Sequence, residues 1–228
     1  MCGIVGYIGE KTIGLDVVLA GLRALEYRGY DSAGVAYADG GKLKVEKQIG
    51  RVDSLTAALG AKVPRANTAI GHTRWATHGA PSSANAHPHY NTDRSIAVVH
   101  NGIIENYAEL KEKLQTLGYT FSSETDTEVI PHLIDHYTKN AKTFEEAFRR
   151  VLSQLRGAYG LLVMTTAEPD KLYAARLGSP LVLGIIDGSG AIVASDPVAV
   201  QSHTKQVVFL NDHEYAVVER ISAYHLHN

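Results

Sequence analysis

The sequence predicts an α+β fold in which antiparallel sheets carry helices on their outer faces. Hairpin signals outnumber strand–helix–strand crossovers, and this balance is typical of antiparallel sheets. Glycine-rich turns at 39–41 and 187–190 each separate two apolar segments and predict hairpins. We find no linker, internal repeat or low-complexity tract in the 228 residues. One large domain, or two small ones at most, is therefore expected.

Short apolar segments rich in β-branched residues predict the strands. They are expected at 3–8, 35–38, 43–47, 68–73, 95–100, 160–164, 172–175, 181–186, 191–194, 207–210 and 215–218. The first is apolar throughout, which indicates a buried strand.

Apolar residues at helical spacing predict four helices. They are expected at 13–25, 106–117, 129–137 and 143–155. Thr143 and Glu146 have the spacing of a capping box, and Thr125 and Glu128 form a similar pair before the third helix. Pro131 lies inside that third helix and is expected to kink it or to shift its start.

Composition and charge exclude several classes of function. The chain is 45% hydrophobic, and its 22 basic and 24 acidic residues give a net charge of −2. This charge gives no reason to expect nucleic acid or an anionic membrane as a partner. No apolar stretch is long enough to span a bilayer, and the N-terminus lacks the features of a signal peptide. The cytoplasm is the expected compartment.

Cys2 is the only cysteine, so an intramolecular disulfide and a cysteine-based zinc site are both excluded. Removal of Met1 would give Cys2 a thiol of pKa about 8.5 and an α-amine of pKa about 8. The amine could accept the thiol proton, directly or through one water, and later return it to a leaving amine. A buried cysteine that opens the first strand is the alternative, and position alone favours neither.

The segment 71–79 runs from a strand end into a loop. There Arg74 can hold a carboxylate with its bidentate guanidinium, and Thr77 can add a hydroxyl donor. Trp75 is the only tryptophan and can form part of a lid. Taken alone, this segment favours a core tryptophan and a surface arginine instead.

Asn101 and Gly102 follow the apolar strand at 95–100. The asparagine amide and the glycine N–H could form an oxyanion hole, although a simple turn is the commoner use of Asn-Gly. Asp126 could hold an ammonium group. Its segment also suits a helix N-terminus, where acidic residues favour the macrodipole.

The 11 histidines form no recognisable metal motif. His87 and His89 flank a proline, but no carboxylate stands at a matching spacing and no His-Glu-x-x-His motif is present. We therefore expect no metal. The chain also lacks a glycine loop for phosphate or dinucleotide, so no cofactor is expected.

Seven motifs occur in a fixed order along the chain. They lie at 2–6, 25–34, 72–79, 85–89, 100–106, 124–128 and 155–160. Each is weak alone, but together they resemble the glutaminase domains of the glucosamine-6-phosphate synthase family, which are class II glutamine amidotransferases. The resemblance covers essentially the whole chain and implies one amidotransferase domain over 1–228. It also implies the N-terminal-nucleophile fold, a four-layer αββα sandwich of two antiparallel sheets between helical layers.

The resemblance further implies a reaction. Cys2 would attack the side-chain amide of L-glutamine and form a thioester, while its own α-amine transfers the proton. Asn101 and the Gly102 backbone would form the oxyanion hole. Ammonia would leave first, and water would then release glutamate.

Substrate-binding roles are implied as well. Arg74 and Thr77 would hold the α-carboxylate of glutamine, and Asp126 its α-ammonium. Trp75 and His78 would lie in the loop that closes over the site, with Gly102 also beside the substrate.

Family members carry a C-terminal sugar-isomerase domain that uses the ammonia to convert fructose 6-phosphate to glucosamine 6-phosphate. Asn228 falls about where that domain would be joined, so we expect the sugar-isomerase domain to be absent from this chain. A homodimer would form through that domain.

With Met1 attached, the nitrogen of Cys2 is an amide and cannot act as a base. A glutamine-binding regulatory module without turnover, or an N-terminal-nucleophile hydrolase for another amide, are the alternative functions.

Overall fold

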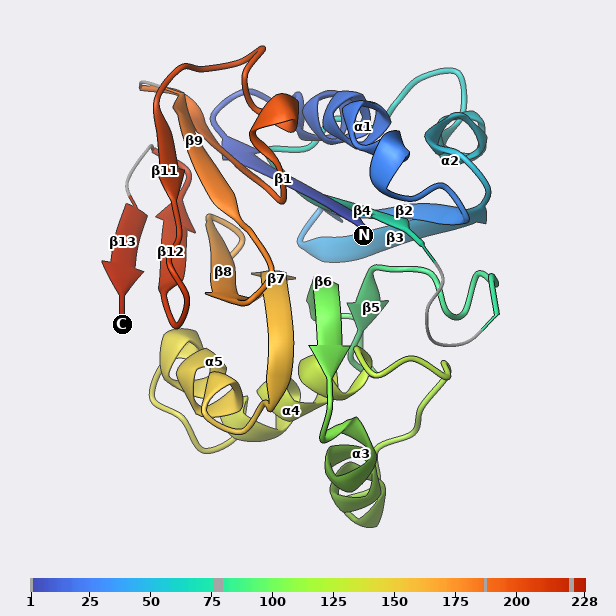
Figure 1. Ribbon diagram of the computed structural model, residues 1–228, viewed down its shortest axis with the longest axis vertical. Coiled ribbons are helices and arrows are strands. Elements are labelled where there is room, and N and C mark those ends of the chain that lie inside the picture. The colour runs from blue at the N-terminus through green and yellow to red at the C-terminus, as the bar shows by residue number, and fades with distance from the viewer. Residues whose placement is uncertain (1, 76–79, 187, 222–223) are drawn as a thin grey trace.

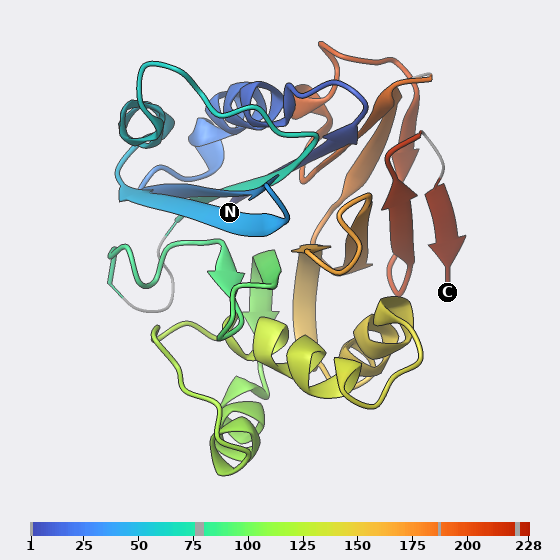
Figure 2. The same cartoon turned by 180° about the vertical axis from the view of Figure 1, so that it is seen from behind.

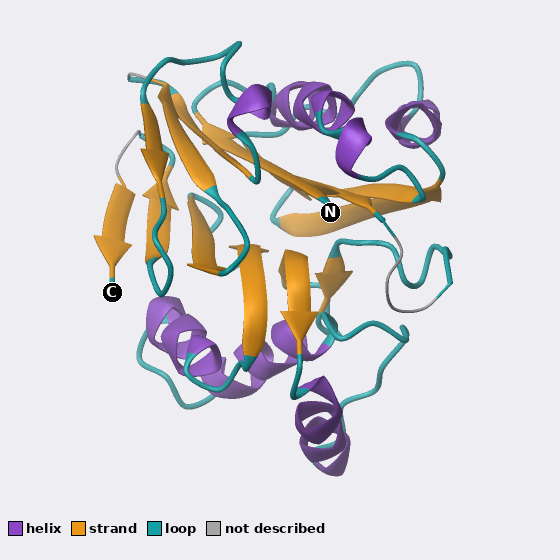
Figure 3. Ribbon diagram, in the orientation of Figure 1, coloured by secondary structure: helices purple, strands orange, loops and turns teal. Residues whose placement is uncertain are grey.

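The computed structural model describes residues 2–75, 80–186, 188–221 and 224–228. Five α-helices lie within these ranges. They are α1 (Gly14–Ala24), α2 (Val52–Leu59), α3 (Tyr107–Thr116), α4 (Val129–Thr138) and α5 (Phe144–Leu152). Two antiparallel sheets lie between α1 and α2 on one side and α3, α4 and α5 on the other (Figures 1 and 3). The predicted α+β class and its αββα layering are confirmed.

The first sheet has seven strands in the order β11-β9-β10-β1-β4-β2-β3. Their bounds are β1 (Gly3–Gly9), β2 (Ser32–Asp39), β3 (Lys42–Ile49), β4 (Thr68–Arg74), β9 (Val182–Ile186), β10 (Gly190–Ala194) and β11 (Val207–Phe209). β1 lies between β10 and β4, and its start is near the centre of the molecule in both views (Figures 1 and 2). Cys2 directly precedes β1, so its position is fixed by a strand that is paired on both sides.

The second sheet has six strands in the order β13-β12-β8-β7-β6-β5. Their bounds are β5 (His89–Tyr90), β6 (Ile96–Ile104), β7 (Gly157–Thr165), β8 (Lys171–Leu177), β12 (Tyr215–Glu219) and β13 (Tyr224–His227). Each predicted strand is thus present, most of them longer than expected. Both predicted hairpins are present too, as β2 pairs with β3 and β9 with β10.

Three apolar clusters fill the spaces between the four layers. Val18 and Leu22 of α1 belong to the cluster beneath the first sheet's helices, and Phe148 of α5 belongs to the one beneath the second sheet's helices. Between the sheets, Ile4 of β1 and Leu162 of β7 belong to the third. Burial of this apolar surface is the main stabilising contribution to such a fold.

The predicted helices are present, with two differences in detail. Thr143 caps α5 by accepting a hydrogen bond from Glu146 N at 3.1 Å, as expected. The Glu146 carboxylate instead accepts from Lys142 N at 2.8 Å. α4 begins at Val129, the predicted residue, so Pro131 has not shifted its start; it is the third residue of the helix and lies in the first turn, where its missing N–H costs no intrahelical bond.

One prediction about the site was wrong in detail. β6 continues through Asn101 and Gly102 to Ile104, so this pair lies inside a strand and does not form a turn after it. Among the α-helices and strands, α2, β5 and β13 were not predicted. The buried residues of α2 are Val52 and Leu55, so the apolar spacing in its sequence is too short to predict a helix.

Candidate active site

Cys2 lies where β1 meets the end of β4. Its Sγ accepts a hydrogen bond from Trp75 N at 3.2 Å and lies 3.7 Å from Trp75 O. Burial raises the pKa of the Cys2 thiol, against the opposing effects of the Trp75 N–H and of the positive charge on Arg74. The thiol is therefore protonated at neutral pH and needs a base before it can act as a nucleophile.

Asn101 reaches Cys2 from the opposite sheet. Its Nδ2 donates to Cys2 O at 2.9 Å, and its Oδ1 lies 3.0 Å from His72 Nε2. An amide nitrogen carries two hydrogens, so the one that Cys2 does not take can serve a substrate oxygen. The neighbouring Gly102 has a φ of +126°, and a Cβ there would lie 2.0 Å from Ala158 O. Only glycine fits this position.

Arg74 and Asp126 place one cation and one anion beside Cys2. Arg74 is 4% exposed and Asp126 is 7% exposed. Both line a cavity of about 30 Å³ together with Cys2 and Gly102. Asp126 is held by Ile104 N, which donates to its Oδ2 at 2.7 Å. The expectation of a surface arginine at position 74 was wrong.

A second cavity, of about 240 Å³, shares Cys2, Trp75 and Gly102 with the first. Its remaining lining residues are Arg28, Asn101, Ile103, Ser179 and Pro180. Cys2 therefore lies at the boundary between a small charged cavity and a larger, more apolar one. The Trp75 side chain is 48% exposed here and is not a core residue.

Sequence reasoning gave no role to Arg28, although it lies in the motif at 25–34. Its Nη1 donates to Ser195 O at 3.1 Å and to Asp196 Oδ2 at 2.9 Å. These bonds tie the start of the motif to the segment after β10. Ser179 and Pro180 carried no signal in the sequence, because only the fold brings them beside Cys2.

A larger cavity, of about 650 Å³, lies elsewhere. It is lined by the β2–β3 hairpin and by residues such as Arg94 and Thr166. Neither Cys2 nor Asn101 borders it, and its lining is largely that of a charged surface groove. We place the chemistry at Cys2 because nucleophile, amide donor and both charged groups converge there.

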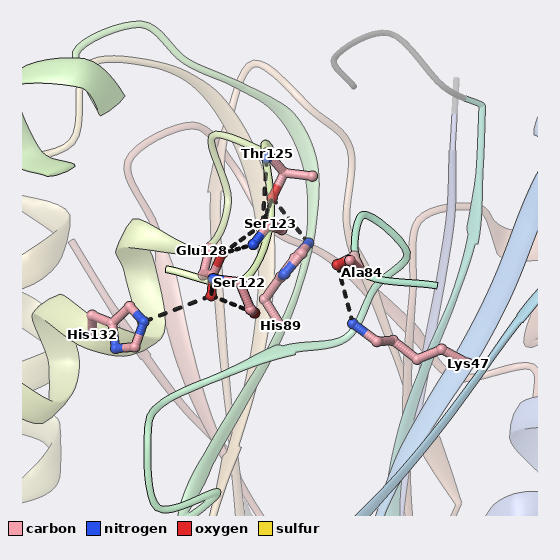
Figure 4. A network of polar contacts seen from close by, with 8 residues as sticks. All are labelled: Lys47, Ala84, His89, Ser122, Ser123, Thr125, Glu128 and His132. Atoms are coloured by element: carbon pink, nitrogen blue, oxygen red, sulfur yellow. Dashed lines mark hydrogen bonds and ion pairs between the residues drawn. The ribbon is translucent and has the colours of Figure 1, made fainter. Parts of the chain in front are cut away.

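A buried carboxylate supports the segment that carries Asp126 (Figure 4). Glu128 accepts from Ser122 N at 2.8 Å, from Ser123 N at 2.7 Å and from both serine hydroxyls. Burial acts to raise the pKa of Glu128, but the nearby His132 ring, whose Nε2 lies 3.8 Å from Oε1, and hydrogen bonds from the two serines hold it well below its usual range. Glu128 is thus a charged anchor for the loop.

The expected capping pair before α4 is therefore wrong. The Thr125 hydroxyl lies 3.0 Å from His89 Nε2 and not at the helix start (Figure 4). Nearby, Lys47 Nζ donates to Ala86 O at 2.8 Å and lies 3.4 Å from Ala84 O. For Thr125, a tertiary partner has replaced the expected local one, which is why spacing alone misassigned this side chain.

Four histidines lie buried behind the site. They are His72, His87, His89 and His100. Desolvation lowers the pKa of all four, that of His72 to about 3. They are neutral at pH 7 and too weakly basic to compete for a thiol proton. The ring centroids of His72 and His87 are 4.1 Å apart.

These histidines predict a loss of stability in acid. The unfolded chain protonates each one below its ordinary pKa of 6.5, whereas folded His72 resists protonation down to about 3. The contribution of these histidines to the free energy of unfolding is therefore fully present above pH 6.5. It falls as the pH drops, by up to about 1.4 kcal/mol per pH unit for each such histidine.

Urea unfolding at about pH 7 and about pH 5 measures this slope of the unfolding free energy against pH. His72→Gln should reduce the slope, and exposed His203→Gln should not; equal slopes in all three proteins would contradict the account.

Thr77 and His78, both predicted to bind substrate, lie outside the described residues. Within the ranges described, no group of three or more histidine, cysteine or acidic side chains is arranged to hold a metal ion. Among the helices of those ranges, none has the length and apolar character needed to cross a membrane.

Comparison with known proteins shows the family to which the chain belongs. The family model described as a glutamine amidotransferase domain matches residues 72–202, more than half of the chain. The chain belongs to this family of enzymatic domains. Its fold is that of the N-terminal-nucleophile amidotransferases.

More particularly, the chain is similar to glutamine–fructose-6-phosphate aminotransferases (isomerising). It is 52% identical to the one from Thermococcus kodakarensis over 222 residues, which are 97% of this chain and 36% of that protein. It is 50% identical to the one from Chlorobaculum tepidum, over 97% of this chain and 36% of that protein. The chain thus spans about a third of the length of these relatives.

Among solved structures, the chain is similar to a glutamine phosphoribosylpyrophosphate amidotransferase from B. subtilis. The two are 28% identical with a TM-score of 0.84, and the match covers 100% of this chain and 49% of that one. A glutamine aminotransferase class-II domain protein from Silicibacter pomeroyi matches 100% of this chain and 99% of its own, with a TM-score of 0.66. At 16% identity, that likeness concerns the fold alone.

Proposed function

We propose that this domain hydrolyses L-glutamine to glutamate and ammonia through a thioester on Cys2. The observation that carries the proposal is the convergence around Cys2 of the Asn101 amide, which donates to Cys2 O, and of two buried, oppositely charged side chains, Arg74 and Asp126, which line the same cavity. Free glutamine carries a carboxylate and an ammonium at one end and an amide at the other. This charge pattern matches the small cavity.

The first half-reaction needs a base for the Cys2 thiol. The α-amine of Cys2, freed by removal of Met1, has an ordinary pKa of about 8 and is the proposed base. Sγ attacks the amide carbon as the thiol proton moves to the amine. The carbonyl oxygen becomes an oxyanion, which the second Nδ2 hydrogen of Asn101 and the Gly102 N–H stabilise. The amine returns the proton to the leaving nitrogen, and ammonia departs.

Water completes the cycle. It attacks the thioester carbon, the amine accepts a proton from it, and the same donors hold the second oxyanion. Collapse of this intermediate breaks the C–S bond and releases glutamate, and the amine returns its proton to the sulfur, which restores the thiol. Arg74 and Thr77 hold the substrate carboxylate, and Asp126 its ammonium. Trp75 and His78 belong to the segment proposed to close over the bound substrate.

Residues 1–228 are proposed to form one amidotransferase domain of a longer enzyme. Relatives at about 50% identity bear the name glutamine–fructose-6-phosphate aminotransferase and are about three times as long. In such a protein the ammonia would pass to a sugar-isomerase domain, which makes glucosamine 6-phosphate from fructose 6-phosphate and carries the homodimer contact. The cytoplasm is the proposed compartment.

Ammonia release from a panel of amides tests the proposed activity. We expect turnover of L-glutamine and little turnover of D-glutamine or of a glutamine that lacks its α-amine, because both fail to pair with Arg74 and Asp126 together. Equal turnover of the whole panel would favour an amide hydrolase of another specificity. Tight binding of glutamine without any ammonia would favour the regulatory module.

Charge at the substrate-binding end is tested by Asp126→Asn. The asparagine oxygen can still accept from Ile104 N, so the loop keeps its hydrogen bond while the negative charge is lost. We expect KM for glutamine to rise about tenfold or more, the equivalent of one charge-assisted hydrogen bond of about 1.5–3 kcal/mol. Glu112→Gln, on the exposed side of α3, is the control and should leave KM unchanged.

A companion variant, Arg74→Lys, keeps the charge but loses the planar fork. It should also raise KM more than it lowers kcat, if the carboxylate contact is the same throughout the reaction. Unchanged glutamine affinity in both variants would remove these two assignments.

A further inference from the structure

The contact between His72 and Asn101 links the two sheets directly behind Cys2. His72 lies on β4 of the first sheet and is 1% exposed, and Asn101 lies on β6 of the second. His72 Nε2 is 3.0 Å from Asn101 Oδ1 and 3.0 Å from His100 O. His72 therefore approaches the asparagine amide from the side opposite to Cys2.

The hydrogen-bond network fixes the direction of the amide. Cys2 O is a carbonyl oxygen and can only accept, so the amide group facing it at 2.9 Å must be the nitrogen. The amide oxygen then faces His72, which must donate from Nε2. His100 O is a second acceptor at the same nitrogen and requires the same hydrogen. Two independent acceptors thus place the proton on Nε2.

Without hydrogen-bond partners, an asparagine amide has little preference between its two orientations. Its oxygen and nitrogen are nearly equal in size, so a half-turn about its terminal bond costs little in packing. In the turned state, Oδ1 would face Cys2 O and the developing oxyanion, and the interaction would be repulsive. A donor behind the amide removes this state, because a turned amide would set its own N–H against the His72 N–H.

We propose that His72 is a positioning residue, whose Nε2–H holds the Asn101 amide with its nitrogen toward the reacting carbonyl oxygen. The inference rests on the proposed function, since it assigns to Asn101 the oxyanion role. The surroundings of His72 suit a fixed orientation. Its ring packs against His87, and its Nδ1 is buried without a hydrogen-bond partner in the described part of the chain. Desolvation keeps the ring neutral, so the donor is the same at every pH at which the thiol can react.

Two substitutions of His72 separate donation from volume. His72→Gln retains an N–H at nearly the position of Nε2, whereas His72→Leu fills the space without a donor. In the full 228-residue chain we expect His72→Leu to lower kcat toward the value of Asn101→Ala, a loss of up to about 10²–10³-fold, while KM for glutamine changes little. His72→Gln should recover most of that loss.

The double variant His72→Leu/Asn101→Ala provides the sharper test. If His72 acts through Asn101, adding His72→Leu to Asn101→Ala should lower kcat no further. If the two losses in kcat multiply in the double variant, His72 acts independently of Asn101 and the proposal for His72 is wrong. A normal kcat in His72→Leu, together with a low kcat in Asn101→Ala, would overturn the proposal for His72 but not the oxyanion role of Asn101. A normal kcat in Asn101→Ala would instead overturn the proposed oxyanion role.

The unmodified protein offers a measurement that does not depend on whether the variants fold. Nitrogen-15 chemical shifts of the imidazole distinguish a protonated ring nitrogen from a bare one. We expect His72 to be protonated at Nε2 and bare at Nδ1 throughout the pH range of activity. The opposite tautomer would overturn the proposal, because that ring has no hydrogen to give to Asn101.

Discussion

Cys2→Ala is expected to lower kcat for ammonia release from glutamine by a factor on the order of 10⁶, while glutamine still binds. The reason is that the thioester needs the Cys2 sulfur, whereas the contacts with the α-carboxylate and α-ammonium come from Arg74 and Asp126. Loss of Sγ leaves Trp75 N–H without its acceptor but removes no apolar contact of the core. Calorimetry should therefore show glutamine binding without heat from turnover.

The covalent intermediate gives this prediction a second readout. Cys2 is the only cysteine, so any thioester formed on rapid quenching must lie on the N-terminal peptide. Mass spectrometry should find a glutamyl adduct there in the unmodified protein and none in Cys2→Ala. The melting temperatures of the two proteins show whether the fold is intact. Sustained ammonia release by a folded Cys2→Ala protein would remove Cys2 as the nucleophile.

Much of the fold could be predicted because local signals and tertiary packing agree. β1 is apolar at nearly every position, and it is buried on both faces between α1 and the second sheet. The turn at 39–41 places Gly40 and Gly41 at positive φ, as its two glycines predict. At such positions the burial or the backbone conformation that the structure requires also determines the local sequence pattern.

The misread positions are those where a distant partner decides the conformation. The Asn101-Gly102 pair lies inside β6 because it pairs with β7, and Ala158 O of that strand leaves no room for a side chain at Gly102. Thr125 bonds His89 in place of a helix N–H. His72 was visible in a motif, but its role depends on Asn101 in the other sheet, which no spacing along the chain can report.

The candidate site was largely predictable as a set of residue types, but not as a geometry. The family motifs point to Cys2, Arg74, Asn101, Gly102 and Asp126, and the fold places these five along the two cavities that meet at Cys2. What the sequence could not supply is the second cavity beside Trp75 and the buried histidines behind Asn101. Both arise from contacts between the two sheets.

Blocking the α-amine of Cys2 is expected to inactivate the domain almost as completely as removing the thiol. Burial raises the pKa of the thiol, and desolvation lowers the pKa of the nearby histidines His87 and His100, so these rings are poor substitutes for the amine. A single residue placed before Cys2 turns the amine into an amide nitrogen. The sulfur, Asn101 and the charged cavity all remain.

Two preparations cut from one fusion protein test the role of the Cys2 α-amine, one beginning at Cys2 and one carrying a single extra glycine before it. Intact mass establishes each N-terminus, and glutamine binding and melting temperature are measured on both as controls for crowding. The N-terminal-nucleophile mechanism predicts ammonia release from the preparation that begins at Cys2 and none above background from the extended one. Equal turnover by both would contradict the N-terminal-nucleophile mechanism and would direct the search for the base to His72, His78 or His100.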